Sequence, residues 1–287
     1  MTAEEFEQKV AAWAAGCPGV AALILIGSRA QPNGRVDSFS DWDYHLVVRD
    51  VAPFVLAGWI EQIAPVWCAH IEQTERGVRK WSVVFAGGFE ADFVLVPAWQ
   101  MKLALRAMRY PWAERFYPAA LRRGISNLRL IAVPGCRLVL GDEEWRDRLS
   151  ALDVPWPVSD MAEEEFTRLV TGYWRHMVWV RKKAARGENL AARRWHVVHA
   201  RENLWRMLEE DARLSGRTPR PEARYAEQWL VEEDRTFLQK VEQGPFKMRL
   251  GEETEFFQRV AARVAKARGF PYDSHAELAR WMATIAG

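Results

Sequence analysis

Three aspartates are the side chains of this sequence whose type and spacing could do chemistry. Asp41 and Asp43 are separated by a single residue, and Asp92 stands inside the apolar stretch 89–96. Carboxylate oxygens are the ligands that Mg²⁺ prefers, usually together with water and substrate phosphates. A metal ion held in this way neutralises and orients a phosphoryl group. The three carboxylates therefore predict a magnesium site that acts on a phosphate compound.

A glycine-serine pair precedes these carboxylates. Gly27 and Ser28 follow the apolar run 20–26, and Arg29 comes next. Gly27 has no Cβ and lets the backbone approach a phosphate closely, while Ser28 offers a hydroxyl and an amide. Arg29 adds a planar donor that is always charged. The pair and the arginine therefore predict contacts to a triphosphate.

The elements that must position these residues are two strands and the loop between them. The continuous apolar run 20–26 is typical of a buried strand, and 29–40, with Pro, Asn-Gly and Ser, is typical of a loop. A second strand is predicted over 43–48. If Asp43 opens this strand, Asp41 and Asp43 point to the same side. Their carboxylates could then share one metal ion or bridge two.

Asp92 belongs to a predicted hairpin. The stretches 81–85 and 89–96 flank Gly87-Gly88, which is typical of a tight turn. Asp92 then lies on the second strand between apolar neighbours, where an unpaired charge would be costly. This placement disfavours the alternative of a solvated acidic turn. Asp92 is predicted to be a third carboxylate that binds metal or accepts a proton from the acceptor.

The rest of the chain is predicted to be mainly helical. Helical periodicity covers 3–15, 53–63, 98–108 and 113–131, followed by a short strand at 138–140. The proline-containing segment 154–158 is typical of a linker. Further helices are predicted over 160–186, with Asp160 in a capping position, and over 189–214, 222–243, 252–268 and 274–286. We expect an α+β fold, with a sheet-containing domain 1–153 and an all-helical domain 158–287.

Composition limits the classes of protein. The 287 residues are 49% hydrophobic and 27% charged, with a formal net charge of +2, which is typical of a globular protein and too weakly basic for one that coats nucleic acid. The N-terminus lacks a signal-peptide pattern and the run 20–26 is too short to span a bilayer, so we expect a cytoplasmic protein without membrane contact. Three widely spaced cysteines make a zinc site or a disulfide framework improbable.

The motifs resemble those of a known family. GSRAQPNGRVDSFSDWDYHLVVRD at 27–50 resembles the aminoglycoside 6-adenylyltransferases, the streptomycin-modifying enzymes of the nucleotidyltransferase superfamily with a polymerase-β-like fold. GGFEADFVLVP at 87–97 is similar to the family's segment around its later acidic residue. EFTRLVTGYWRHMVWVRKKAARGENL at 165–190 and FFQRVAARVAKARGFPY at 256–272 resemble its C-terminal helices. The resemblance therefore extends over nearly the whole chain.

The resemblance implies a nucleotidyltransferase catalytic domain with a mixed sheet, followed by a helical substrate-binding domain. It implies transfer of AMP from ATP to a hydroxyl, with two Mg²⁺ ions and release of pyrophosphate. The implied catalytic and metal-binding residues are Asp41, Asp43 and Asp92, and the implied nucleotide-binding residues are Gly27, Ser28, Arg29 and Lys182. We expect Asp92 to act as the base, with Glu188 as the second choice.

The acceptor is less clearly implied. An aminoglycoside is a polycation, so acidic groups should line its site, and Glu188 and Glu202 are the candidates. The stretch 193–201 is instead rich in arginine and histidine, which leaves open a protein or nucleic-acid acceptor, or a nucleotide-binding relative without activity. His196 and His199 lack a third metal ligand, so we expect them on a helix face or bonded to an acceptor. The run 209–211 is expected to be solvated, and a monomer or a homodimer both remain open.

Overall fold

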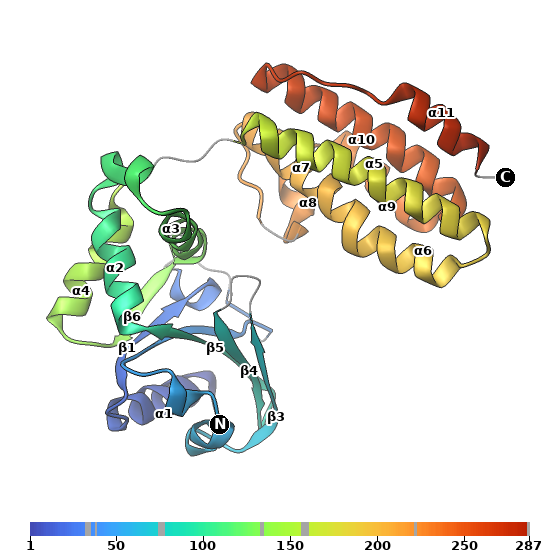
Figure 1. Ribbon diagram of the computed structural model, residues 1–287. Helices are drawn as coiled ribbons and strands as arrows, with labels where there is room; N and C mark the ends of the chain where they lie inside the picture. The colour runs from blue at the N-terminus through green and yellow to red at the C-terminus, as the bar shows by residue number, and fades with distance from the viewer. Residues whose placement is uncertain are drawn as a thin grey trace. The chain divides into compact units, whose positions relative to one another are not determined.

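The structure is a computed structural model that describes residues 1–31, 36–37, 39–73, 78–132, 135–155, 161–220 and 223–285. The chain divides into two compact units, Met1–Val158 and Ser159–Gly287 (Figure 1). The catalytic and substrate-binding roles expected for 1–153 and 158–287 stay predictions. Part of the predicted linker 154–158 and the predicted capping residue Asp160 lie outside the described residues.

Unit 1 is built on one six-stranded mixed sheet, which confirms the α+β prediction. The strand order is β3-β4-β5-β2-β1-β6. Strands β2 and β5 are parallel neighbours, and the other neighbouring strands are antiparallel. The strands are β1 (Val20–Ile26), β2 (Trp42–Val48), β3 (Val66–Gln73), β4 (Arg79–Phe85), β5 (Phe89–Pro97) and β6 (Cys136–Leu140).

The two faces of this sheet pack against different helices. One face packs against α1 (Ala3–Gly16) through an apolar cluster that includes Phe6, Tyr44 and Phe93. The other face packs against α2 (Ala98–Met108), α3 (Ala119–Ala132) and α4 (Glu143–Leu149). Figure 1 shows α1 on one side of the sheet and α2 and α3 on the other. Because strand residues alternate, Asp43 and Asp92 lie on the face that α2 and α3 cover.

Three predictions for unit 1 were wrong or incomplete. The helix expected over 53–63 is instead two 3₁₀ turns, η2 (Ala52–Phe54) and η3 (Ala57–Gln62), since proline and glycine interrupt the segment. The helix expected over 113–131 is divided into η4 (Pro111–Phe116) and α3, with Pro118 before α3. Strand β3 was not predicted. It lies at the edge of the sheet, and most of its side chains are exposed.

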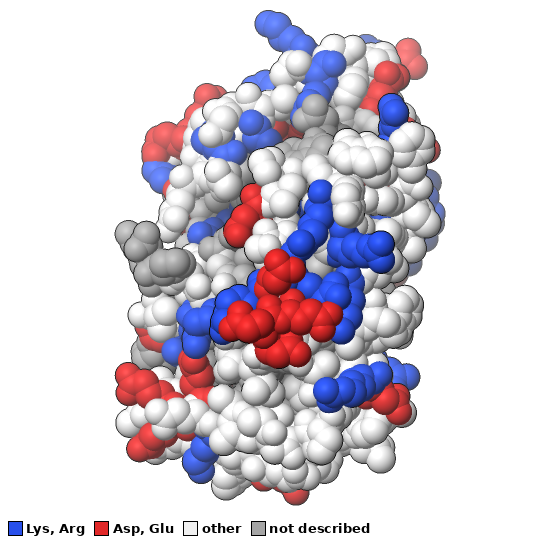
Figure 2. Space-filling model, turned by 90° about the vertical axis from the view of Figure 1, so that its left-hand side faces the viewer, with Lys and Arg blue, Asp and Glu red and all other residues white. Residues whose placement is uncertain are grey.

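Helices α2 and α4 carry an interleaved charged surface. Lys102 of α2 pairs with Glu144, Arg109 pairs with Asp147, and Arg148 also pairs with Glu144. Figure 2 shows acidic and basic side chains side by side on the face where these helices lie. Asp142 caps the N-terminus of α4, since its side chain accepts a hydrogen bond from the Trp145 amide. A short turn, η5 (Ser150–Asp153), completes the described helical elements of this unit.

Unit 2 is helical in the part that the structure describes. Its helices are α5 (Glu163–Ala185), α6 (Asn189–Trp195), α7 (Arg201–Leu214), α8 (Ala226–Trp229), α9 (Glu232–Gln243), α10 (Phe246–Arg268) and α11 (Ala276–Thr284). Tyr173 and Phe257 stack at 3.7 Å in its core. Across the described ranges of both units, no helix combines the length and apolarity needed to cross a membrane.

Helix boundaries in unit 2 differ from the sequence predictions. A π-helical turn, η6 (His196–Ala200), joins α6 to α7 inside the segment predicted as one helix. The segment 222–243 contains two helices, because the chain is extended at Leu230 and three acidic residues favour a new helix start at Glu232. Helix α10 begins at Phe246 rather than 252, since Phe246 and Leu250 are buried in the core and carry the helix across a glycine.

The acidic run 209–211 is buried, so its prediction as a solvated face was wrong. Arg268 of α10 bonds to Glu210, and Arg263 of the same helix bonds to Asp211. Arg213 pairs with Glu209 within α7. Arg263 and Arg268 of α10, together with Arg213 of α7, supply the countercharge that makes burial of these carboxylates possible.

Candidate active site

Asp43 and Asp92 lie directly opposite each other in the sheet. Asp43 is the second residue of β2, and Asp92 is its register partner on the parallel strand β5. Both point to the same face and both are half-buried. Two carboxylates are thus brought together from positions far apart in the sequence.

Gly27 fits closely against Asp43. It follows the last residue of β1 and has φ +77°, a conformation that favours glycine. A Cβ at this position would meet Asp43 Oδ2 at 2.7 Å. Strand β1 then passes into the 3₁₀ turn η1 (Ser28–Ala30), where Ser28 is half-buried. The turn and the carboxylate therefore share one narrow space, which only glycine leaves open.

The Arg29 side chain spans the ends of the loop. Its Nε lies 3.1 Å from the carbonyl oxygens of Ser40 and Asp41, and Nη2 donates to Ser40 at 2.6 Å. The guanidinium also lies 3.5 Å from the ring centroid of Trp42. Burial lowers the pKa of Arg29, against the charges of nearby acidic groups. These contacts fix the backbone that carries Asp41, and a triphosphate contact by Arg29 stays a prediction.

Asp41 directly precedes β2 and is half-buried. Among the residues that the structure describes, no three histidine, cysteine or carboxylate side chains are grouped closely enough to hold a metal ion. The Asp43 carboxylate nevertheless suits Mg²⁺, which is commonly held by one or two carboxylates and completed by substrate phosphates and water. The arrangement suits an ion that arrives with a nucleotide, and the metal roles of Asp41, Asp43 and Asp92 stay predictions.

Lys80 is a site residue that sequence reasoning missed. Its Nζ lies 2.7 Å from Asp92 Oδ2 and 2.8 Å from Glu72 Oε1. The predicted hairpin around Gly87-Gly88 is present, and it pairs Ser82 with Asp92. Alternation from Ser82 then places Lys80 on the face of Asp92, so the hairpin itself contained the signal.

The whole sequence was compared with known proteins. It matches the streptomycin adenylyltransferase family over residues 1–283. The chain belongs to this family. It is therefore an adenylyltransferase, and the family implies ATP and a small-molecule acceptor as its substrates.

A solved structure and the curated proteins were compared as well. The crystal structure of an aminoglycoside 6-adenyltransferase from Bacillus subtilis is similar over 99% of both chains, with 15% sequence identity and a TM-score of 0.44. The comparison with curated proteins found no match.

Three residues of unit 2 were predicted to serve this adenylyltransferase. Lys182 is exposed on α5, with Nζ 5.4 Å from the ring centroid of Trp281. Glu188 forms an ion pair of 2.6 Å with Lys183. Glu202 is exposed on α7. The nucleotide contact by Lys182 and the acceptor contacts by Glu188 and Glu202 stay predictions.

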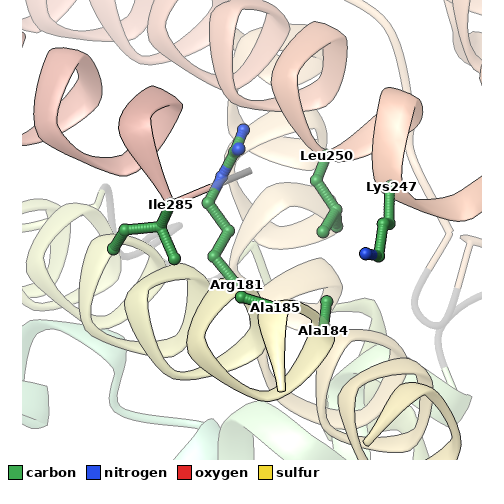
Figure 3. A pocket seen from close by; sticks show the side chains of 6 residues that line it. All are labelled: Arg181, Ala184, Ala185, Lys247, Leu250 and Ile285. Atoms are coloured by element: carbon green, nitrogen blue, oxygen red, sulfur yellow. The ribbon is translucent and has the colours of Figure 1, made fainter. Parts of the chain in front are cut away.

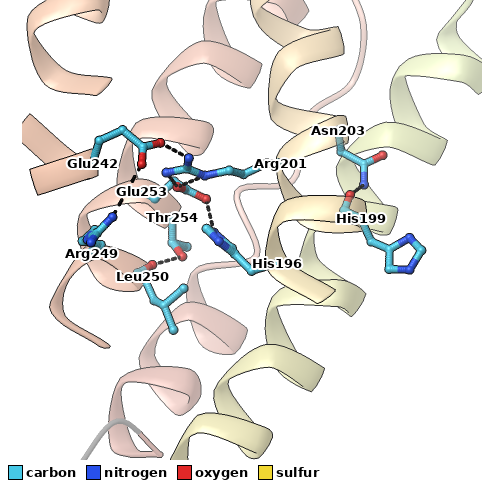
Figure 4. Close-up of polar contacts among 9 residues, drawn as sticks. All are labelled: His196, His199, Arg201, Asn203, Glu242, Arg249, Leu250, Glu253 and Thr254. Carbon is cyan, nitrogen blue, oxygen red and sulfur yellow. Dashed lines mark hydrogen bonds and ion pairs between the residues drawn. The ribbon is translucent and has the colours of Figure 1, made fainter. Parts of the chain in front are cut away.

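The basic stretch 193–201 is partly neutralised inside unit 2. Figure 4 shows His196 and Arg201 converging on Glu253 of α10, a carboxylate that is fully buried. His196 Nε2 lies 2.6 Å from Glu253 Oε1, and Arg201 Nη2 lies 2.8 Å from Oε2. Arg201 also bonds to Glu242. His196 was expected on a helix face or bonded to an acceptor. It lies in the helical turn η6, and its buried ring bonds to Glu253.

His199 has different neighbours from His196. Its ring lies 4.1 Å from that of Trp195 and stacks at 5.1 Å on that of His176, whose Nδ1 is 3.1 Å from the Trp195 indole nitrogen. Partial burial lowers the pKa of His176, and the charges of His199 and Arg175 act in the same direction. These rings pack mainly against one another, half-exposed at the surface of α5 and α6.

A small pocket in unit 2 is lined by α5 and α10. Figure 3 shows Arg181 and Lys247 at its wall with Leu250 and Ile285. The cavity measures about 10 Å³, which is room for about one water molecule. It is too small for a nucleotide or an aminoglycoside.

Proposed function

We propose that this enzyme transfers AMP from ATP to a hydroxyl of a small molecule, an aminoglycoside such as streptomycin, and releases pyrophosphate with the help of Mg²⁺. The observation that carries the proposal is the placement of Asp43 and Asp92 side by side, next to the Gly27 turn. Hard carboxylate ligands beside a backbone that approaches phosphate are what nucleotidyl transfer requires. Membership of the family supplies the reaction class.

The roles follow from the chemistry of each residue. Asp41 and Asp43 would hold Mg²⁺, which supplies neutralisation of the triphosphate charge when it is bound. Gly27 and Ser28 would let the phosphates approach the backbone. Asp92 would accept the proton of the attacking hydroxyl, since a carboxylate on the same face is within reach of the same substrate.

The charges of unit 2 bear on the choice of acceptor. The basic stretch 193–201 is the reason to consider an anionic acceptor. His196 and Arg201, however, bond to Glu253 and are not available to an acceptor in this arrangement. Because these two side chains are engaged by Glu253, they give less support to a nucleic acid as the acceptor. A cationic small molecule is then the better candidate for the acceptor.

The test is a pyrophosphate-release assay with purified protein, ATP, Mg²⁺ and a panel of aminoglycosides. We expect turnover with at least one of them, and a loss of about 100-fold or more in Asp43→Asn, because the metal would lose a charged ligand. Asp50→Asn is the matched control, since Asp50 is an exposed aspartate just after β2. Full activity in Asp43→Asn would contradict the mechanism, and no turnover across the panel would contradict the antibiotic acceptor.

A protein or nucleic-acid acceptor remains the second candidate, because Arg193 and Arg194 stay exposed on α6. It predicts that label from the α-phosphate of ATP enters macromolecules when the enzyme is added to cell lysate. Label recovered only in small molecules would exclude it. Tight ATP binding without transfer to any acceptor would instead indicate a nucleotide-binding relative without activity.

A further inference from the structure

A lysine shares the sheet face that carries the predicted catalytic carboxylates. Lys80 lies on β4, next to β5, and its ammonium lies 2.7 Å from Asp92 Oδ2. Asp92 is in turn the register partner of Asp43 on β2. The strand that carries Lys80 therefore flanks β5 on the side away from β2, the strand that carries Asp43.

Glu72 holds Lys80 from the other side. It lies opposite Lys80 in the register of β3 and β4, and its Oε1 is 2.8 Å from Nζ. One ammonium thus bridges carboxylates of two flanking strands, and its position is fixed by both. The side chains of Lys80 and Asp92 are each 24% exposed, so solvent screens this contact only in part.

The lysine keeps its charge in this setting. A lysine side chain is positively charged at neutral pH. Its two ion pairs place that charge between Glu72 and Asp92.

Taking the proposed function as given, we infer that Lys80 is a positioning residue that supplies the positive charge beside Asp92 and keeps a divalent ion away from that carboxylate. Metal binding is then left to Asp41 and Asp43. Asp92, held by Lys80, is the group that accepts the proton of the acceptor hydroxyl. The active site would accordingly use one divalent ion, whereas the family resemblance implies two.

The physical reason is charge repulsion at short range. A divalent ion bound to Asp92 would lie within a few ångströms of the Lys80 ammonium, where like charges repel strongly, and more strongly still in a partly buried site. Lys80 would have to leave both carboxylates before a second ion could bind. Replacing it with an uncharged side chain removes this obstacle and leaves Glu72 and Asp92 without a cation.

The test measures metal binding directly. Mn²⁺ is titrated into the full chain with α,β-methylene ATP, and bound ions are counted by electron paramagnetic resonance. With the nucleotide present, we expect one bound Mn²⁺ per chain in the wild type and two in Lys80→Met. Without nucleotide, Lys80→Met should bind Mn²⁺ at least about tenfold more tightly than the wild type does. Lys80→Arg keeps a cation and should bind one ion. Arg79→Met is the matched control, since the neighbouring Arg79 is exposed and on the opposite face.

The outcomes separate this inference from the proposed function. Two ions in the wild type, or Lys80→Met titrating like the wild type, would overturn the inference, even with pyrophosphate release intact. A wild type that binds no Mn²⁺ with the nucleotide would overturn both. Circular dichroism confirms that each variant is folded, and a folded Lys80→Arg that binds two ions would also contradict the role of the charge.

Discussion

At the scale of single residues, the candidate site is held in place by contacts among its own side chains. Arg29 illustrates this most clearly. Sequence motifs predict that it contacts the triphosphate, whereas its guanidinium bonds to the carbonyl oxygens of Ser40 and Asp41 and lies on the Trp42 ring. Its position is explained by support of the loop that ends in Asp41. The two roles differ in their effect on kinetics.

We expect Arg29→Met to lower kcat by about 100-fold, because Asp41 loses the support that fixes its backbone. The KM for ATP should change far less, since uniform binding of the nucleotide would be retained. Arg29→Lys should also lose activity, because an ammonium cannot reproduce the planar fork over Trp42. Steady-state kinetics with varied ATP distinguishes the roles. A large rise in KM with kcat preserved would show that Arg29 binds the triphosphate.

At the scale of elements, the turn after β1 and the start of β2 form one unit through Gly27. We expect Gly27→Ala to lower kcat/KM by about 100-fold, because the new Cβ would displace the Asp43 carboxylate. The strained backbone should also cost about 1–3 kcal/mol of stability. Gly16→Ala is the control, since nothing lies within 4 Å of its Cβ position. Activity and thermal melting like the wild type in Gly27→Ala would contradict this account.

Local sequence patterns predicted the helices and strands whose formation depends on residues close together in the chain. The strands around Gly27 and the hairpin at Gly87-Gly88 follow from apolar runs and turn residues close in sequence. The pairing of Asp43 with Asp92 could not be predicted, because it requires β5 to lie parallel to β2 across a long separation. Lys80 was missed for a related reason, since its role appears only once the hairpin register is applied. Edge strand β3 was missed as well, and most of its side chains are exposed.

At the scale of the whole molecule, the helical unit depends on buried charges that no sequence pattern indicated. Glu253 is fully buried between His196 and Arg201, which lie far from it in the chain. Burial acts to raise the pKa of this carboxyl, but the bonds and charges of His196 and Arg201 outweigh it and hold the pKa below its ordinary value near 4.5. Its ionised form therefore stabilises the folded state.

The lowered pKa of Glu253 determines how the stability of the protein depends on pH. The stabilisation is complete above the pKa of the unfolded carboxyl and is lost as pH falls through the lower pKa of the folded protein. We expect Glu253→Gln to lower the free energy of unfolding by about 3 kcal/mol at neutral pH, because Arg201 and His196 remain buried but lose their charged partner. The variant should also lose less stability on acidification than the wild type. Urea unfolding at several pH values measures both, with exposed Glu232→Gln as the control.

The proposed reaction transfers the α-phosphate of ATP, as AMP, to a small-molecule hydroxyl at the Asp43–Asp92 pair. The most direct measurement incubates the purified enzyme, Mg²⁺ and streptomycin with ATP labelled at either the α- or the γ-phosphate, and follows the label by chromatography and mass spectrometry. We expect α-label on an adenylylated drug and γ-label in pyrophosphate, and neither product in Asp43→Asn. Label from the γ-phosphate on the drug, or α-label transfer that persists in Asp43→Asn, would contradict it.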